Sequence, residues 1–286
     1  MPEGYSPLKL YRDLLVAQNV RPVLKRDYVR ASEIGGTQLD TWLSMRGLPH
    51  TNPKTHKDLL TFAVGNAVEE AVAEVFVKAG VGIRPTEHNP IVLEEPNLLP
   101  VHGREDVLLE VTNWGETKAR LSALEAMGKT PKEQATNIRS VLEEWQEAYP
   151  EGLQRTILEI KSCNSQAFET GKRMGFLEKY PQYAMQLFTY MRHYQVETGH
   201  LFFVDKDKQY SECVGVARTP RLEDAWSGWL AQMTRYHREN LPPPLPNAEE
   251  GWRITYSPYK DLLTRAKYNP KVISDAVAEY ESQRLR

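Results

Sequence analysis

The sequence predicts an α/β fold in which a central mixed sheet is flanked by helices. Segments with helical spacing of apolar residues alternate with short apolar and β-branched runs, in the order helix, strands, helix, strands. At 286 residues, of which 41% are hydrophobic and 26% charged, the chain is long enough to bury one large core. We therefore expect a single domain over 1–286 that carries a helical insertion.

The N-terminal part is expected to contain two short helices and a long one. Ser32 can cap a short helix that the glycine pair at 35–36 ends early, and a second short helix is expected at 39–46. From 58 to 79 apolar residues recur at helical spacing, and Gly80 closes the pattern. This segment is the first element with sustained helical periodicity.

Two strands and a helical insertion are expected next. The β-like stretches at 82–93 and 99–111 are separated by a Glu-Glu-Pro-Asn turn at 94–97, which predicts a hairpin or adjacent strands. The segment 115–152 is rich in Ala, Leu, Glu and Lys and is broken by Gly-Lys-Thr-Pro at 128–131. We interpret it as a helical hairpin inserted between two strands.

The second half supplies the other side of the predicted sheet. A β-branched and apolar run at 156–162 predicts a strand, and Pro181 precedes a helix expected at 183–197. A closing pair of strands is expected at 200–204 and 212–217.

The C-terminal segment 241–286 is expected to pack on the core. Its four prolines within 241–246 predict an extended linker or a surface loop. A helix is expected to follow at 276–286.

Composition and charge restrict the class of protein. No run of 18 or more apolar residues is present and charges are scattered through 1–24, so we expect a soluble, cytoplasmic protein without a membrane partner. Cys163 and Cys213 can form neither a disulfide framework nor a four-cysteine metal site, and we expect both to be structural thiols. The net charge of -2 gives no global attraction to nucleic acid, so a polyanionic partner requires a local basic patch.

The run Leu-Glu-Ile-Lys-Ser at 158–162 contains the first candidate site residues. The strand period of two places Glu159 and Lys161 on one face and the apolar residues beside them on the other. A carboxylate can hold a divalent ion against a phosphate, and a lysine two residues along can orient the attacking water or stabilise developing charge. Glu-x-Lys alone is also typical of a solvated strand face, so other residues must support the site.

Two further carboxylates are candidates. Asp106 leads into an apolar run at the edge of a buried strand, where an unpaired carboxylate is costly, although an ordinary turn aspartate is the alternative. On the long helix, Glu69 lies nearer the apolar boundary than Glu70, and Gly65 one turn earlier leaves room for another element; solvated glutamates are the alternative. These oxygen ligands favour magnesium or manganese over zinc, because His and Cys are not clustered.

Polar and aromatic residues share one face of the helix expected at 183–197. They are spaced by three and four residues: Tyr183, Gln186, Tyr190 and Tyr194. Tyrosines at such spacing are more often core than ligand contacts. A buried glutamine must find hydrogen-bond partners, so we expect Gln186 to hold a catalytic lysine or a phosphate backbone.

Together these motifs resemble those of RecB-like nucleases of the PD-(D/E)xK superfamily. They follow the family's order: Gly-x-x-x-Glu at 65–69, Gly-x-x-Asp at 103–106, Glu-x-Lys at 159–161 and Gln-x-x-x-Tyr at 186–190. The family commonly has His where this chain has Glu69, a departure that retains an oxygen ligand. The resemblance implies a restriction-endonuclease-like core, with the 115–152 insertion outside it.

Within that superfamily the chain is most similar to the CRISPR-associated and phage-encoded exonucleases. Those proteins usually bind an iron-sulfur cluster through one early and three late cysteines. Thr37 stands where the early cysteine would be, and the late ones are replaced by Ile254, Ser257 and Leu263. We therefore expect no iron-sulfur cluster, and we expect apolar packing to tie the C-terminal segment to the N-terminal one.

The resemblance implies a metal-dependent exonuclease acting on linear single- or double-stranded DNA in recombination, repair or phage DNA processing. The implied ligands of one or two Mg²⁺ or Mn²⁺ ions are Glu69, Asp106, Glu159 and the backbone carbonyl of Ile160. The implied catalytic residues are Asp106, Glu159, Lys161, Gln186 and Tyr190. Lys161 would orient the attacking water, and Gln186 and Tyr190 would support Lys161 or the DNA strand.

Two alternatives stay open beside the exonuclease. One is a structure-specific endonuclease; the other is a non-catalytic DNA-binding or assembly protein on the same fold, with 115–152 as its protein-partner surface. The presence of Asp106, Glu159 and Lys161 together argues against the non-catalytic alternative. The candidate contacts to a DNA backbone are Lys172, Arg173, Arg192 and Arg218.

Overall fold

The computed structural model describes residues 7–19, 22–79, 81–83, 90–111, 113–126, 132–247 and 251–284. The chain divides into two compact units. Unit 1 comprises Met1–Val64, Glu94–Val101 and Ala225–Arg286, and unit 2 comprises Gly65–Leu93 and His102–Asp224. In the described part of the chain, no helix has the length and apolar character needed to cross a membrane.

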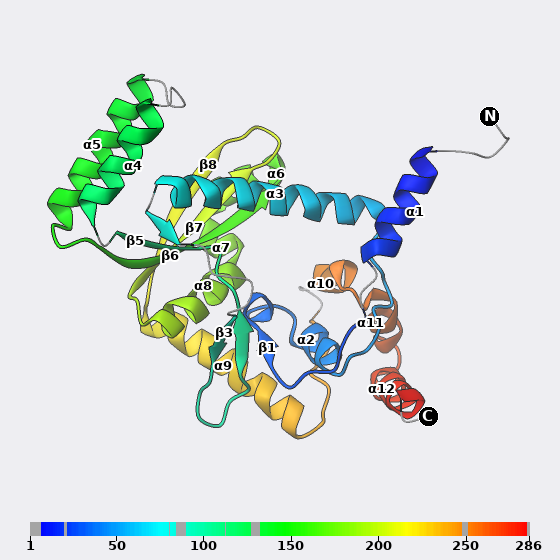
Figure 1. The fold of residues 1–286 in the computed structure, drawn as a ribbon. Helices are drawn as coiled ribbons and strands as arrows, with labels where there is room; N and C mark the ends of the chain where they lie inside the picture. The colour runs from blue at the N-terminus through cyan, green and yellow to red at the C-terminus, as the bar shows by residue number, and fades with distance from the viewer. Residues whose placement is uncertain are drawn as a thin grey trace. The chain divides into compact units, whose positions relative to one another are not determined.

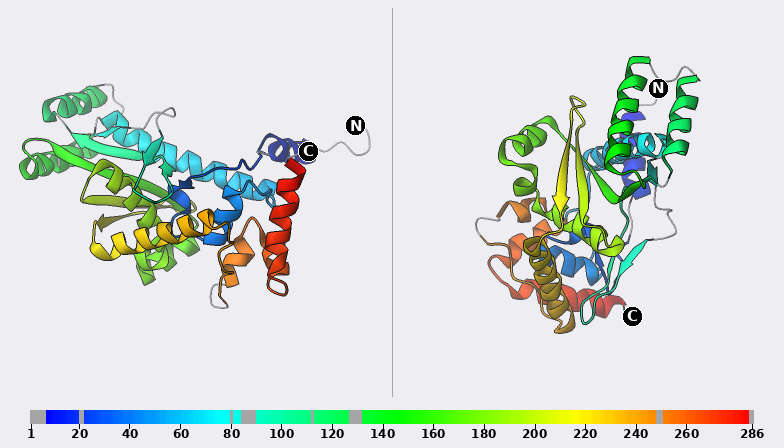
Figure 2. Two further views of the ribbon diagram at one scale, coloured as in Figure 1. Left: turned by 90° about the horizontal axis from the view of Figure 1, so that it is seen from below. Right: turned by 90° about the vertical axis from the view of Figure 1, so that its left-hand side faces the viewer.

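A five-stranded mixed sheet forms the centre of unit 2 (Figure 1). Its strands, in spatial order, are β2 (Gly82–Ile83), β5 (Val107–Val111), β6 (Leu153–Cys163), β7 (Thr198–Asp205) and β8 (Ser211–Ala217). The β6 and β7 strands are parallel, and the other three neighbouring pairs are antiparallel. The predicted mixed α/β architecture is confirmed, and Figure 2 shows the predicted closing pair as the long β7–β8 hairpin drawn in yellow.

Helices cover both faces of this sheet. The C-terminal part of α3 (His56–Ala79) places Ala73 against Leu158 and Ile160 of β6. On the other face, α8 (Pro181–Tyr194) packs so closely on β7 that a Cβ at Gly199 would lie 2.9 Å from a methyl carbon of Leu187. The parallel connection from β6 to β7 runs through α6 (Ser165–Met174), α7 (Phe176–Lys179) and α8.

The prediction of one continuous strand at 99–111 is wrong. It consists of β4 (Val101–Gly103) and β5, separated by three residues that end at Asp106. The interruption has a physical cause, because the side chains of Glu105 and Asp106 are turned to partners in α8 and β6. Of the stretch predicted at 82–93, β2 and β3 (Ile91–Leu93) are present, and residues 84–89 and Gly80 lie outside the described residues.

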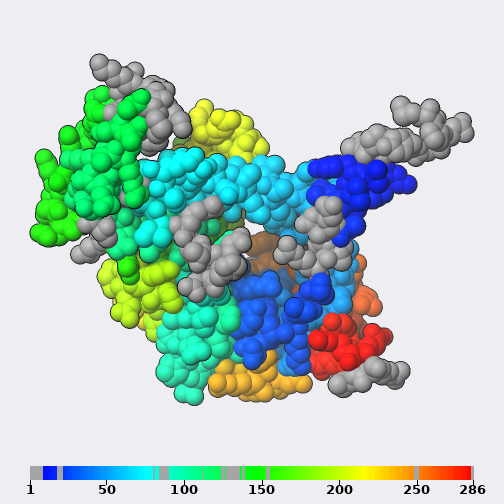
Figure 3. Space-filling model, in the orientation of Figure 1, coloured from blue at the N-terminus to red at the C-terminus, as the bar shows by residue number. Residues whose placement is uncertain are grey.

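Two helices occupy the segment interpreted as a helical hairpin, α4 (Trp114–Ala126) and α5 (Lys132–Ala148). Their apolar residues form a small core with Val81 and Val111 at the edge of the sheet, and its buried members in the hairpin are Trp114, Leu121 and Leu142. The hairpin forms a lobe at one end of unit 2, drawn in green in Figure 3. The predicted break at 128–131 lies outside the described residues.

Unit 1 is mainly helical. Its elements are α1 (Pro7–Asn19), β1 (Val29–Arg30), a 3-10 helix at Ala31–Glu33, α2 (Gln38–Met45), most of α9 (Pro220–Arg238), α10 (Gly251–Tyr256), α11 (Lys260–Ala266) and α12 (Lys271–Arg284). The predicted cap at Ser32 is wrong, because the 3-10 helix begins one residue earlier and Arg30 is its N-cap. The second short helix is confirmed as α2, and 241–247 has no regular structure, as the prolines predict.

Candidate functional site

The predicted Glu-x-Lys pair lies in the middle of β6, on the sheet face that α8 covers. The Glu159 side chain is 2% exposed and that of Lys161 is 18% exposed. Lys161 Nζ donates a hydrogen bond to Glu159 Oε1 at 2.6 Å. The alternative of a solvated strand face is therefore wrong for this pair.

Gln186 joins the pair from α8. Its Nε2 donates to the same Glu159 Oε1 at 2.6 Å and lies 3.2 Å from the hydroxyl of Tyr190. Both Gln186 and Tyr190 are buried. The structure thus brings four of the predicted site residues into one hydrogen-bonded group. In this group Gln186 holds the carboxylate of Glu159, whereas the sequence led us to expect that it holds the lysine or a phosphate backbone.

Asp106 reaches the same strand from the residue before β5. Its Oδ2 accepts a hydrogen bond from the backbone N–H of Ile160 at 2.6 Å. The antiparallel register that pairs Val107 with Leu158 places it there. Asp106 therefore lies beside Glu159 although the two are 53 residues apart in the sequence.

Glu69 approaches the group from α3. Gly65 allows that approach, since a Cβ at this position would lie 3.0 Å from Ser162 Oγ. Burial and, to a smaller extent, the Asp106 carboxylate together raise the pKa of Glu69 to about 7, against the opposing charge of Lys161. The neighbouring Glu70 is exposed, so Glu69 is the glutamate of this helix that shares the field of the other site residues.

The Glu159–Lys161 pair is tightly coupled. Burial raises the pKa of Glu159 to about 8, against the opposing effect of the Lys161 ammonium. Burial also lowers the pKa of Lys161, but the carboxylates of Glu159 and Asp106 outweigh it, and the net shift is upward. The lysine is therefore a permanent cation, and the glutamate can exchange a proton near neutral pH.

The acidic residues offer the donor set of a hard divalent cation. Glu159 Oε2 is buried and has no hydrogen-bond partner among the described residues. A buried carboxylate oxygen without a partner is costly, and a cation would satisfy it. No three His, Cys, Asp or Glu side chains within the described ranges form a group arranged to hold a metal ion.

One buried carboxylate beside the site was not predicted. Glu105 is 2% exposed, and its Oε1 accepts a hydrogen bond from the hydroxyl of Tyr194 at 2.5 Å. The sequence offered one signal, since Tyr194 shares the helix face of Gln186 and Tyr190. Glu105 itself lies in a segment that was expected to be continuous strand.

The four predicted cations differ in their surroundings. Arg192 is paired with Glu223 at 2.5 Å, and Arg218 lies 3.7 Å from the same carboxylate. Lys172 and Arg173 are exposed in the last turn of α6. Of these four cations, Lys172 and Arg173 are the two whose charges remain available to a polyanion in the part of the chain that the structure describes.

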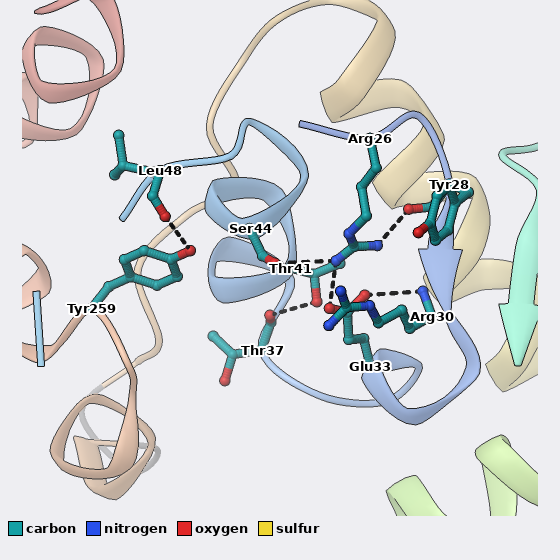
Figure 4. A network of polar contacts seen from close by, with 9 residues as sticks. All are labelled: Arg26, Tyr28, Arg30, Glu33, Thr37, Thr41, Ser44, Leu48 and Tyr259. Atoms are coloured by element: carbon teal, nitrogen blue, oxygen red, sulfur yellow. Dashed lines mark hydrogen bonds and ion pairs between the residues drawn. The ribbon is translucent and has the colours of Figure 1, made fainter. Parts of the chain in front are cut away.

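The positions that would carry cluster cysteines lie in unit 1. Ile254 and Leu263 are buried, as apolar packing requires, but Ser257 Oγ donates to Asp40 at 2.7 Å. Close by, the hydroxyl of Tyr259 donates to the backbone carbonyl of Leu48 at 3.1 Å (Figure 4). Hydrogen bonds therefore join the C-terminal segment to the N-terminal one in addition to the apolar packing that was expected.

A polar cavity of about 250 Å³ lies next to these contacts. Asp40 lines it, and burial raises the pKa of this carboxyl to about 6, against the hydrogen bond from Ser257 and the charge of Arg253. Two residues that line the cavity, Glu33 and Ser44, accept hydrogen bonds from the guanidinium of Arg26 (Figure 4). This network gives unit 1 a polar centre beside its apolar core.

Comparisons with known proteins give distant likenesses only. No protein-family model matches the chain, and no curated protein matches its sequence. The crystal structure of SSO0001 is similar with a TM-score of 0.48 and 9% identity, over 88% of this chain and 93% of that one. An alkaline exonuclease, LHK-Exo from Laribacter hongkongensis, is similar with a TM-score of 0.41 and 13% identity, over 80% and 97% of the two chains. At these values neither likeness assigns an activity to this chain.

Proposed function

We propose that the chain is a divalent-metal-dependent deoxyribonuclease with a PD-(D/E)xK-type core, acting as an exonuclease on linear DNA. The observation that carries the proposal is the meeting of Glu159, Lys161 and Asp106 at β6, with Glu159 Oε2 buried and unpartnered among the described residues. The motif order supports it independently, and we extend the proposal to a role in DNA recombination, repair or phage DNA processing.

The carboxylates of Glu69, Asp106 and Glu159, with the backbone carbonyl of Ile160, would hold Mg²⁺ or Mn²⁺. A bound ion would acidify a coordinated water and offset the charge of the scissile phosphodiester. Glu159 Oε2, which has no hydrogen-bond partner among the described residues, is the oxygen open to the ion, while Oε1 keeps its bond to Lys161. The metal and Lys161 would therefore share the Glu159 carboxylate through different oxygens.

Lys161 supplies the fixed positive charge of the site. Its ammonium is anchored at 2.6 Å to Glu159 and lies 5.1 Å from the centre of the Tyr183 ring. From this position it can orient the attacking water and stabilise charge on the phosphate. Gln186 keeps Glu159 in place, because it donates to the same oxygen from α8.

The test is cleavage of end-labelled linear single-stranded DNA, linear duplex and closed circular DNA, each with Mg²⁺, Mn²⁺ or EDTA. Wild type is compared with Glu159→Ala and Lys161→Ala, and Glu70→Ala is the matched control on an exposed helix position. Metal-dependent loss of linear DNA alone, abolished in the two site variants and kept in the control, supports the exonuclease. Cutting of circles would favour an endonuclease, and DNA binding without any cleavage would favour the non-catalytic alternative.

A further inference from the structure

A single face of α8 contacts both acidic parts of the site. Gln186, Tyr190 and Tyr194 are spaced by four residues, so they form one row of about 12 Å along the helix. At one end of the row Gln186 donates to Glu159, and at the other Tyr194 donates to Glu105. The function proposed above uses only the first of these contacts.

Glu105 and Asp106 are consecutive carboxylates with different anchors. Glu105 accepts the hydrogen bond from Tyr194 on α8, and Asp106 accepts the N–H of Ile160 on β6 at 2.6 Å. The short connection that carries them joins β4 to β5 and interrupts what would otherwise be one strand. The backbone of Asp106 is thus fixed between a helix and a strand.

Packing alone does not account for Glu105. Its side chain is 2% exposed, and its Oε2 has no partner among the described residues. Burying a carboxylate with one oxygen unsatisfied destabilises the fold, whereas an apolar side chain of similar volume would fill the space without that cost. The Glu105 carboxylate therefore lowers the stability of the fold, and such a cost is typical of a residue with a role in a functional site.

We propose that Glu105 and Tyr194 are positioning residues for Asp106. The Tyr194 hydroxyl holds the 104–106 connection against α8, so that the Asp106 carboxylate faces Glu159 from a fixed distance. The row on α8 then sets the separation of two metal-binding carboxylates through Gln186 and Tyr194. This inference rests on the proposed function, because it assigns Asp106 to the metal.

The test uses Tyr194→Phe and Glu105→Leu, which remove the hydrogen bond from either side, and Glu105→Gln, which keeps an acceptor for the hydroxyl. Tyr180→Phe is the matched control, since its hydroxyl donates to a backbone carbonyl, that of Ala167, at 3.2 Å. The readouts are Mn²⁺ binding by calorimetry and the Mn²⁺ dependence of linear DNA cleavage. Thermal unfolding checks that each variant is folded.

We expect Tyr194→Phe and Glu105→Leu to need about tenfold more Mn²⁺ for half-saturation, the usual effect of losing a residue that orients a ligand. The rate at saturating Mn²⁺ changes less, because the ligands themselves are intact. Glu105→Gln and Tyr180→Phe stay within about twofold of wild type, since neither removes the anchor. A purely structural role would lower the melting temperature without this split between half-saturation and rate.

Two results would overturn the inference. One is a Tyr194→Phe variant that binds Mn²⁺ as the Tyr180→Phe control does; the other is a Glu105→Gln variant as impaired as Glu105→Leu. A wild type that neither binds Mn²⁺ nor cleaves DNA would remove the proposed function itself, and the positioning role with it. The wild-type measurement alone separates that case from the other two.

Discussion

At the scale of the residue, the Lys161 ammonium and the metal have separable roles. Glu159 Oε1 binds the lysine, and Oε2 is the oxygen that would bind the ion. If Lys161 orients water and stabilises the phosphate, its removal should affect the reaction more than metal binding. If instead Lys161 only neutralises Glu159, its removal should affect the cleavage rate and metal binding to the same extent.

We predict that Lys161→Ala lowers the cleavage rate by about 100-fold or more while Mn²⁺ still binds. The binding is measured at pH 9, because the pKa of about 8 that Glu159 has beside the Lys161 ammonium rises further when the lysine is removed. Calorimetry should still detect Mn²⁺ binding to the variant, because the carboxylate oxygens are intact. Loss of Mn²⁺ binding in this variant would show that the lysine is needed to form the metal site.

Asp40 in unit 1 makes stability depend on pH. Burial raises its pKa from the ordinary 3.8 to about 6, so the folded protein holds this proton more tightly than the unfolded chain. Its contribution is full below about pH 4 and is lost as the pH rises through 6. The Ser257 hydroxyl and the Arg253 charge limit the shift but do not cancel it.

We predict that the free energy of unfolding of wild type, relative to Asp40→Asn, falls by about 2 kcal/mol between pH 4 and pH 6.5. Urea unfolding of both proteins across this range measures the difference, and all other titrating groups cancel between them. A difference that stays flat, or rises with pH, would mean that Asp40 is not held in its protonated form.

The spacing of residues predicted most of the site but not all of it. Alternation along 156–162 identified Glu159 and Lys161, and helix periodicity identified Gln186 and Tyr190. Glu105 could not be predicted, because its burial depends on a strand break that only long-range contacts produce. In a segment expected to be one continuous strand, no local feature marks this glutamate as buried.

At the scale of the element, the approach of α3 to β6 depends on Gly65. A Cβ there would lie 3.0 Å from Ser162 Oγ, so either the hydroxyl or the helix would have to shift by a few tenths of an ångström. Glu69 is one turn along the same helix, so any displacement is passed to it. The site therefore depends on a position that carries no functional group.

We predict that Gly65→Leu destabilises the protein by about 1–3 kcal/mol and weakens Mn²⁺ binding, because the added side chain overpacks the contact. Ser162→Ala removes the opposing hydroxyl, so the double variant should recover part of both losses. Thermal unfolding and calorimetry on the two single variants and the double variant test the coupling. Strictly additive effects would show that the two residues do not press on each other.

The long helices and the alternating strands were the predictable elements. The segment 58–79 and the region after Pro181 are helical as expected, because their apolar residues recur with the helical period over several turns. The strand expected at 99–111 failed at one point, where side-chain hydrogen bonds of Glu105 and Asp106 replace the ladder. Such bonds join residues far apart in the sequence and leave no local periodicity.

At the scale of the whole molecule, a net charge of -2 requires a local basic surface for DNA. Arg192 and Arg218 are engaged with Glu223, whereas Lys172 and Arg173 are exposed at the end of α6. Each phosphate contact contributes about 0.9 to the slope of log affinity against log salt concentration. The two pairs should therefore differ in the salt dependence of binding.

We predict that Lys172→Ala/Arg173→Ala reduces the salt slope by about 2, and that Arg192→Ala/Arg218→Ala changes it by less than about 0.5. Fluorescence anisotropy with labelled DNA and EDTA measures binding without cleavage, so the result does not depend on catalysis. Equal slopes for wild type and the α6 variant would place the DNA contact elsewhere on the chain.

The division into two units was beyond reach of the sequence. Unit 1 joins three separate stretches of chain, and the hydrogen bond from the Leu99 N–H to Thr234 Oγ1 spans 135 residues. The helix α9 was also missed, although Trp226, Leu230 and Met233 are buried at helical spacing. Local periodicity can identify a helix, but assembly of distant segments depends on contacts that it does not encode.

The central claim is that the acidic residues around β6 hold a divalent cation. Isothermal titration of Mn²⁺ into wild type, Asp106→Asn and Glu159→Gln tests it most directly, with Glu70→Gln as the exposed control. We predict binding to wild type and to Glu70→Gln that is lost or weakened at least about tenfold in the two site variants. Equal binding to all four proteins, or no binding to wild type, would contradict the claim.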